Sequence, residues 1–231
     1  MYHSAGPDLS LFFLRPQSRH SRVNPSLETM AVPDGASCYI CLDEAPDEEG
    51  RPLVRDCSCR GPGAGFAHLS CIVKYAEQKS KQTANIKGKL PTSSFSEPWN
   101  DCPNCKQPFK NQLSLDLSSA FVSFAEATYG YHGNNPDDKM NVMRALRSSI
   151  ATYVDVLREN MMREAGLTTR WGQNNVDSNS ILAQTAECKR LLTKLLSMVD
   201  QMKKDLKMDG WIHMPRTSFK YQLYKMLRVF Y

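Results

Sequence analysis

The sequence lacks any long apolar run. None of its 231 residues lie in a stretch that approaches the roughly eighteen consecutive apolar residues of a membrane-spanning helix. The longest apolar candidate near the N-terminus, residues 9–14, includes a serine and precedes no small-residue cleavage site, so it does not resemble a secretory signal. Residues 15–22 are rich in Arg and Ser, which is typical of a disordered tail, with a transit peptide as the alternative.

The chain also lacks a strong excess of one charge. It has 29 Lys and Arg against 24 Asp and Glu, a formal net charge of +5. Apart from four lysines between residues 79 and 89, the basic residues are scattered, and such a lysine run is usually a solvated loop. The charge pattern therefore argues against a nucleic-acid partner.

Cysteine, in contrast, is abundant and clustered. Of the eight cysteines, seven lie between residues 38 and 105, and Cys188 stands alone on the apolar stripe of an expected helix. Without an export signal, clustered cysteines indicate metal binding rather than disulfides. We therefore expect a reducing compartment, the cytosol or the nucleus, and a core position for Cys188.

The clustered cysteines and one histidine form four closely spaced pairs. The pairs are Cys38 and Cys41, Cys57 and Cys59, His68 and Cys71, and Cys102 and Cys105. Two such pairs complete a tetrahedron around Zn²⁺, so four pairs predict two closed sites with no position left for substrate. The sequence therefore predicts two structural zinc ions, each contributing about 10–16 kcal/mol to folding.

Seven cysteines with histidine as the fifth ligand resemble the RING-CH pattern of membrane-associated RING-CH ubiquitin ligases and their relatives. The resemblance covers about residues 37–110. It implies a small α+β finger with interleaved, cross-braced sites. By ligand order, site one is Cys38, Cys41, His68 and Cys71, and site two is Cys57, Cys59, Cys102 and Cys105.

The PHD finger uses the same ligand types and is the main alternative. A single residue between Cys57 and Cys59 and the long gap before His68 favour RING-CH. Trp99, just before Cys102, resembles the PHD tryptophan and keeps a chromatin reader open as a hypothesis. A reader needs an aromatic cage for methylated lysine. The available aromatics are Tyr39, Phe66, Trp99 and Phe109.

The RING-CH resemblance implies a ligase without a nucleophile, which positions a ubiquitin-charged conjugating enzyme. The residues that match the enzyme-binding groove of the family are Ile40, Tyr75 and Pro103, where family members often have tryptophan at the position of Tyr75. Lys106 stands where an arginine often clamps ubiquitin. The alternative is that Ile40 and Tyr75 only pack the finger.

The chain divides by composition into a flexible tail at residues 1–36, the finger at 37–110 and an all-α domain at 111–231. Within the finger we expect a helix at 67–81 and a loop at 79–98. Apolar residues at helical spacing predict four further helices: one ending at Gly130, one from Asn135–Pro136 to Gly166, one ending near Gly210, and one after Pro215. These helices form either a bundle or the start of a helical-repeat array.

These features give a leading hypothesis of a soluble RING-CH ubiquitin ligase whose helical region recruits a protein substrate of unknown identity. The alternatives are a non-enzymatic zinc-finger adaptor and a PHD-type chromatin reader.

Overall fold

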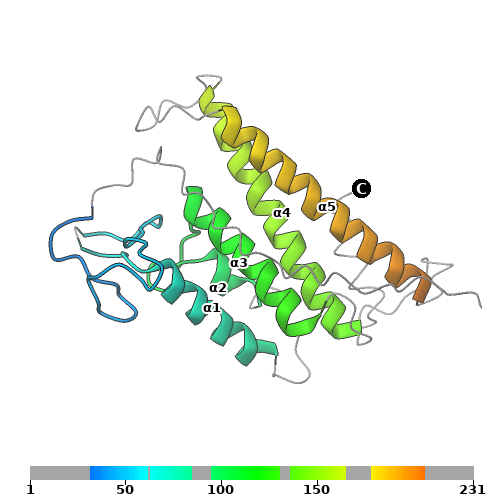
Figure 1. The fold of residues 1–231 in the computed structure, drawn as a ribbon, viewed down its shortest axis with the longest axis horizontal. Coiled ribbons are helices and arrows are strands. Elements are labelled where there is room, and N and C mark those ends of the chain that lie inside the picture. Colours follow the sequence, from blue (N-terminus) through cyan, green and yellow to red (C-terminus); the bar gives the residue numbers. More distant parts are fainter. Residues whose placement is uncertain (1–31, 62, 85–94, 131–135, 165–177, 206–231) are drawn as a thin grey trace, which may run out of the picture.

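The computed structural model of the protein describes residues 32–61, 63–84, 95–130, 136–164 and 178–205. Within them lie five helices, which run from the finger on one side of the molecule to a long helical hairpin on the other (Figure 1). Their bounds are α1 Leu69–Ala84, α2 Glu97–Asn100, α3 Asn111–Tyr129, α4 Pro136–Glu164 and α5 Ser178–Asp205. The expected helix after Pro215 and most of the expected N-terminal tail lie outside the described residues.

The helix expected at residues 67–81 is confirmed as α1. It buries Ile72, Ala76 and Ser80, which recur at helical spacing, and exposes Lys74 on the other face. The expected loop at 79–98 was partly wrong, because α1 continues to Ala84 and α2 begins at Glu97. A single helical turn has too few residues to show periodicity, so α2 could not be found from the pattern alone.

Helix α3 lies at the centre of the molecule, in contact with α1, α2 and α4. Its predicted end at Gly130 is confirmed: Gly130 follows the last helical residue with φ 72°, a conformation that glycine adopts at little cost. Its N-terminus is tied to the finger, since the Lys110 N–H donates to the carbonyl of Asp56 and Asn111 Nδ2 donates to Asp56 Oδ1.

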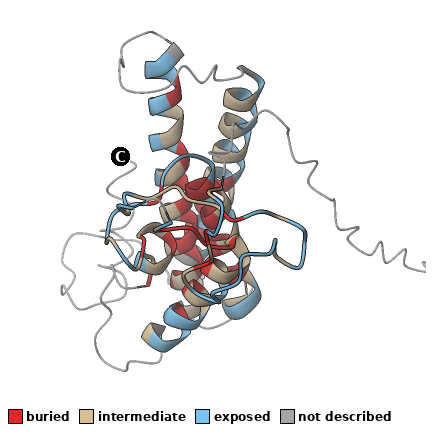
Figure 2. Cartoon of the chain, turned by 90° about the vertical axis from the view of Figure 1, so that its left-hand side faces the viewer, coloured by how far each residue is buried: buried red, intermediate tan, exposed pale blue. Residues whose placement is uncertain are grey.

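Helices α4 and α5 form an antiparallel hairpin of 29 and 28 residues. The predicted start at Pro136 is confirmed, with Asp137 and Asp138 in the first turn, where acidic side chains favour the helix dipole. Buried residues gather where these helices meet the rest of the protein, while the far part of the hairpin is mostly exposed or half-buried (Figure 2). Whether these helices begin a repeat array stays a prediction.

Two apolar cores share α3. The first half of the helix, with Leu113 and Leu117, packs into the core of the finger, which also contains Ile72 of α1 and Phe109. The second half packs into a helical core that also contains residues of α1, α2, α4 and α5. The expected division between residues 110 and 111 therefore falls beside a helix that contributes to both cores.

The β component of the finger is small. Within the described residues it consists of two isolated bridges, between Val54 and Ala67 and between Asp101 and Pro108. No helix among those the structure describes combines the length and apolar character that crossing a bilayer requires.

Candidate metal centres

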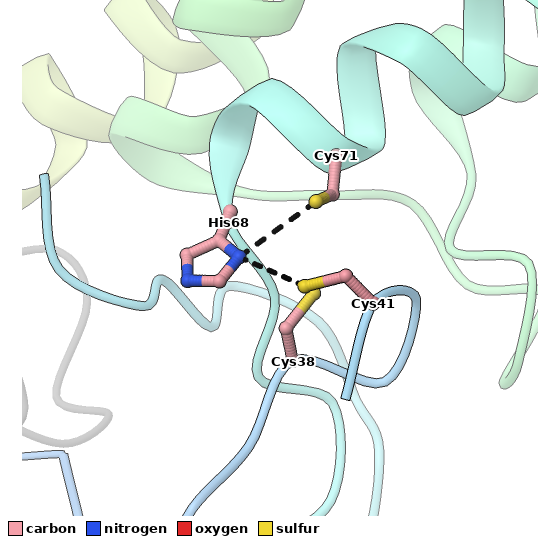
Figure 3. A group of neighbouring side chains, drawn as sticks. All are labelled: Cys38, Cys41, His68 and Cys71. Atoms are coloured by element: carbon pink, nitrogen blue, oxygen red, sulfur yellow. Dashed lines mark hydrogen bonds between the residues drawn. The ribbon is translucent and has the colours of Figure 1, made fainter. Parts of the chain in front are cut away.

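The first cluster joins a tight turn to the start of a helix. Cys38 and Cys41 lie on the turn, and His68 and Cys71 lie at the N-terminal end of α1 (Figure 3). Nδ1 of His68 lies 3.3 Å from Sγ of Cys41 and 3.7 Å from Sγ of Cys71. A tetrahedral zinc with ordinary bond lengths separates nitrogen and sulfur ligands by about 3.5 Å, so this cluster fits the ion.

The orientation of His68 is fixed from outside the cluster. Its Nε2 lies 2.6 Å from the carbonyl oxygen of Ala45. A carbonyl only accepts, so Nε2 carries the proton and donates, which leaves the lone pair of Nδ1 directed at the cysteines. His68 is only 4% exposed, and a hydrogen bond from the nitrogen that does not bind the metal is the usual way in which a zinc-binding histidine is held.

The second cluster contains Cys57, Cys59, Cys102 and Cys105, whose sulfur atoms all lie within 4.8 Å of one another. Sγ of Cys59 and Sγ of Cys102 are 3.8 Å apart, which matches the separation of about 3.8 Å expected for two thiolates on one tetrahedral zinc. The two pairs come from segments more than forty residues apart, so the ion would link the middle of the finger to its end.

The loop before α1 approaches the second cluster closely because residue 65 is glycine. Gly65 is buried and has φ +83°. A Cβ atom there would lie 2.7 Å from Cβ of Cys59, closer than carbon atoms pack, and 3.0 Å from Sγ of Cys57, so that at least the Cys59 side chain would have to move. The same loop is held by Arg55, whose guanidinium donates to the carbonyls of Cys59 and Gly61 and lies 5.4 Å from the ring centroid of Phe66.

Two congruent turns supply half of the ligands. In the first, the Leu42 N–H donates to the Cys38 carbonyl, and the Cys38 N–H donates to the Asp43 carbonyl. The second repeats this pattern at Cys102, with Lys106 as donor and Gln107 as acceptor. The residue after the second cysteine has a positive φ in both turns, 66° at Leu42 and 56° at Lys106.

The thiols respond to burial and to their neighbours. Burial raises the pKa of the Cys71 thiol to about 12, with further contributions from the cysteines beside it. Burial and the neighbouring thiols also raise the pKa of Cys59. At Cys38, burial opposes deprotonation, but the backbone N–H groups of Cys41, His68 and Ile40 outweigh it and bring the pKa to about 7. Crowded thiolates repel one another, and a bound dication removes that penalty.

The residues predicted to contact a conjugating enzyme lie at the finger surface. Ile40 is 37% exposed, Tyr75 and Pro103 are half-buried, and Lys106 is exposed. Tyr75 lies on α1, where Nζ of Lys79 approaches its ring to 6.0 Å. Their role in binding a conjugating enzyme stays a prediction.

The four aromatics considered for a methyl-lysine cage are not collected into one. Phe66 and Phe109 are buried in the finger core, whereas Trp99 is buried in the helical core, stacked on Phe121 with ring centroids 5.0 Å apart. Tyr39 is half-buried and packs against the finger core. The hypothesis of a chromatin reader therefore loses the feature that it required.

Cys188 lies apart from both clusters. It is half-buried and packs against the helical core, where burial raises the pKa of its thiol.

Sequence reasoning found the ligands of both clusters, but it missed the residues that hold them in place, Gly65, Arg55 and Ala45. A glycine and an arginine in a loop carry no sequence signal that distinguishes them from solvated residues.

Comparison with protein families identifies residues 38–86 as a RING-variant domain. The match contains the first six ligands and ends before Cys102 and Cys105, which the fold brings to Cys57 and Cys59. The chain thus carries a cross-braced RING-variant finger with two zinc-binding clusters. No curated protein and no solved structure matches the chain.

Proposed function

We propose that the protein is a RING-type ubiquitin ligase that binds a ubiquitin-charged conjugating enzyme and presents its thioester to an acceptor lysine. The observation that carries this proposal is the position of Ile40. It lies between two ligands of the first cluster, on a turn closed by two backbone hydrogen bonds, and its side chain is 37% exposed. An exposed aliphatic side chain on so rigid a turn is suited to contact a partner.

The rest of the proposed contact surface is also held by metal-binding segments. Pro103 lies between two ligands of the second cluster, and Tyr75 lies on α1, one helical turn after Cys71. Zinc would fix these segments relative to one another, so the surface would be preformed when the enzyme arrives. A finger of this kind acts by positioning and needs no nucleophile of its own.

Lys106 is the proposed contact to ubiquitin. It is exposed and follows the last ligand directly. Lysine offers a positive charge but lacks the planar, two-pronged guanidinium of arginine, so we expect its contribution to be smaller.

The helical hairpin is the proposed site of substrate recruitment. In its far part, α4 exposes Val154, Met161 and Met162, with exposed fractions of 49%, 60% and 41%. Methionine adapts its shape readily, so such a surface suits a protein partner.

The alternative function is a non-enzymatic adaptor. It is favoured by the same hairpin together with Lys106 in place of arginine.

The test is an assay of ubiquitin discharge from a panel of conjugating enzymes to free lysine. Wild type should accelerate discharge by at least one enzyme, and Ile40→Ala should lose most of that activity while two zinc ions remain bound, because no ligand is changed. Leu196→Ala is the matched control: Leu196 is 40% exposed but lies on α5. If wild type is folded and zinc-loaded but inert with every enzyme, the ligase proposal is wrong and the non-enzymatic adaptor takes its place.

A further inference from the structure

Tyr39 has its backbone in the first metal-binding turn but lies against the second cluster. It stands between two ligands of the first cluster, and its N–H donates to the carbonyl of Phe66 at 3.0 Å. Tyr39 nevertheless lines an open groove together with Cys59 and Cys105, and both of these are ligands of the second cluster. None of the four first-cluster ligands, all of which the structure describes, lines that groove.

The hydroxyl of Tyr39 is buried without a partner. The side chain as a whole is half-buried, but its oxygen is shielded from solvent, and no hydrogen-bond partner for it lies in the part of the chain that the structure describes. Burying a hydroxyl without a hydrogen bond costs free energy of folding. A phenylalanine would fill the same space without that cost, so the presence of the hydroxyl needs an explanation.

The environment of the phenol places it near the second cluster. Burial raises the pKa of Tyr39 most, and among the cysteines that raise it further Cys102 and Cys57 of the second cluster have the largest effects, ahead of the adjoining Cys38. Tyr39 also packs against the core of the finger, which contains Cys102 at 0% exposure. The phenol is therefore a protonated donor on the buried side of the second cluster.

The second cluster also has the greater need of a donor. One dication leaves a single excess negative charge on the three thiolates of the first cluster and two on the four thiolates of the second. Hydrogen bonds from neighbouring groups stabilise such buried charge. In the first cluster a backbone donor is already in place, since the Ile40 N–H lies 3.4 Å from Sγ of Cys38.

We propose that Tyr39 is the outer hydrogen-bond donor of the second zinc cluster, and that its hydroxyl donates to a cysteine sulfur of that cluster when the ion is bound. Tyr39 is then a positioning residue and not a ligand. Because its backbone belongs to the first turn, it also joins the two clusters: ordering of the first turn brings the donor to the second ion. This role is independent of the ligase function.

Tyr39→Phe tests the proposal because it removes the hydroxyl and keeps the ring. In competition with a chelator, the variant should bind the second ion about tenfold more weakly than wild type and the first ion equally well. A hydroxyl without a partner predicts the opposite. Its removal would then leave zinc binding unchanged or tighter, with a melting temperature equal to that of wild type or higher, and either result would overturn the proposal.

Cadmium-113 NMR of the full chain identifies the cluster that the hydroxyl contacts. With cadmium in place of both zinc ions, the two clusters should give separate resonances, because one has a nitrogen ligand and the other has four sulfur ligands. Tyr39→Phe should shift the resonance of the four-sulfur cluster and leave the other in place.

The matched control is Tyr129→Phe. Tyr129 is also half-buried, but it packs against the helical core, so its replacement should shift neither cadmium resonance. An unchanged four-sulfur resonance in Tyr39→Phe, or a shift confined to the first cluster, contradicts the proposed contact. Equal weakening of both ions contradicts it as well, since the variant would then have lost folding of the finger and not one hydrogen bond.

Discussion

At the scale of single residues, Gly65 decides whether the second cluster can close. Gly65→Ala places a methyl group against Cys57 and Cys59 and also forces an unfavourable φ. We expect the variant to lose the second ion, so that the zinc content measured by elemental analysis falls from two per chain toward one. Gly50→Ala is the control, because Gly50 has φ +73° but open space around it, and it should keep both ions.

The predicted zinc ligands and Cys188 should respond unequally to replacement. Cys41→Ala, His68→Ala or Cys102→Ala leaves an incomplete cluster, so the finger should lose metal and unfold. Cys188→Ala removes one half-buried sulfur from the helical core and should cost about 1 kcal/mol of unfolding free energy. Zinc content and denaturant unfolding measure both effects. An equal loss at Cys188 would show that the helical core depends on that thiol.

The residues that could be predicted from the sequence are those whose chemistry depends on spacing. The ligand pairs were found because cysteine or histidine residues separated by only one or two residues are distinctive. Their interleaved pairing came from the family resemblance and is confirmed. The hydrogen bond from His68 to Ala45 could not be predicted, because it joins a side chain to a backbone carbonyl 23 residues away. Trp99 was misleading because its role also depends on a contact with a distant segment. Its position before Cys102 suggested a PHD-type chromatin reader, whereas it is buried through its packing on α3.

At the scale of elements, one hydrogen bond connects α1 to α2. The Trp99 indole N–H donates to Oγ of Ser80 at 2.8 Å, and this hydroxyl in turn donates to the carbonyl of Phe95. Both side chains are buried. Ser80→Ala therefore leaves the indole N–H without a partner in an apolar core, which costs about 1–3 kcal/mol.

Denaturant unfolding of Ser80→Ala should show this loss, with Thr83→Ala as the control. Thr83 also lies on α1, but its hydroxyl is exposed and bonds back to the carbonyl of Lys79. Its replacement should change stability by only a few tenths of a kcal/mol. Equal effects of the two variants would mean that the Ser80 hydroxyl does not fasten α2.

Elements with several helical turns were predictable, and the one-turn element was not. Helices α3, α4 and α5 show a sustained apolar stripe, and the predicted ends at Gly130 and Pro136 rest on residues with strong local preferences. Helix α2 has four residues and owes its place to Trp99 packing on α3. Such tertiary support leaves no periodic signal in the sequence.

At the scale of the whole molecule, the finger and the helices are connected through α3. Its first half completes the finger core with Leu113 and Leu117, and its second half packs Phe121 against Trp99 in the helical core. Composition placed a boundary at residue 110, because the cysteines end there and helical stripes begin. Shared cores depend on contacts between distant segments, and the sequence pattern of each segment does not show them.

This sharing predicts that removal of zinc reaches the helical core. Chelation should free α1 and the segment around Cys102 from the zinc ions that they bind. This should loosen α2 between them and so expose Trp99, which is now 1% exposed. The measurement uses a chain in which Trp171 and Trp211 are replaced by phenylalanine, so that Trp99 is the only tryptophan left of three. With chelator, its emission should shift to longer wavelength, and the helical signal in circular dichroism should melt at a lower temperature than in the zinc-loaded chain. Returning zinc should restore both signals, which separates loss of the ion from irreversible aggregation. If the finger loses both ions while Trp99 emission and the melting of the helices stay unchanged, the cores fold independently, and the division at residue 110 holds.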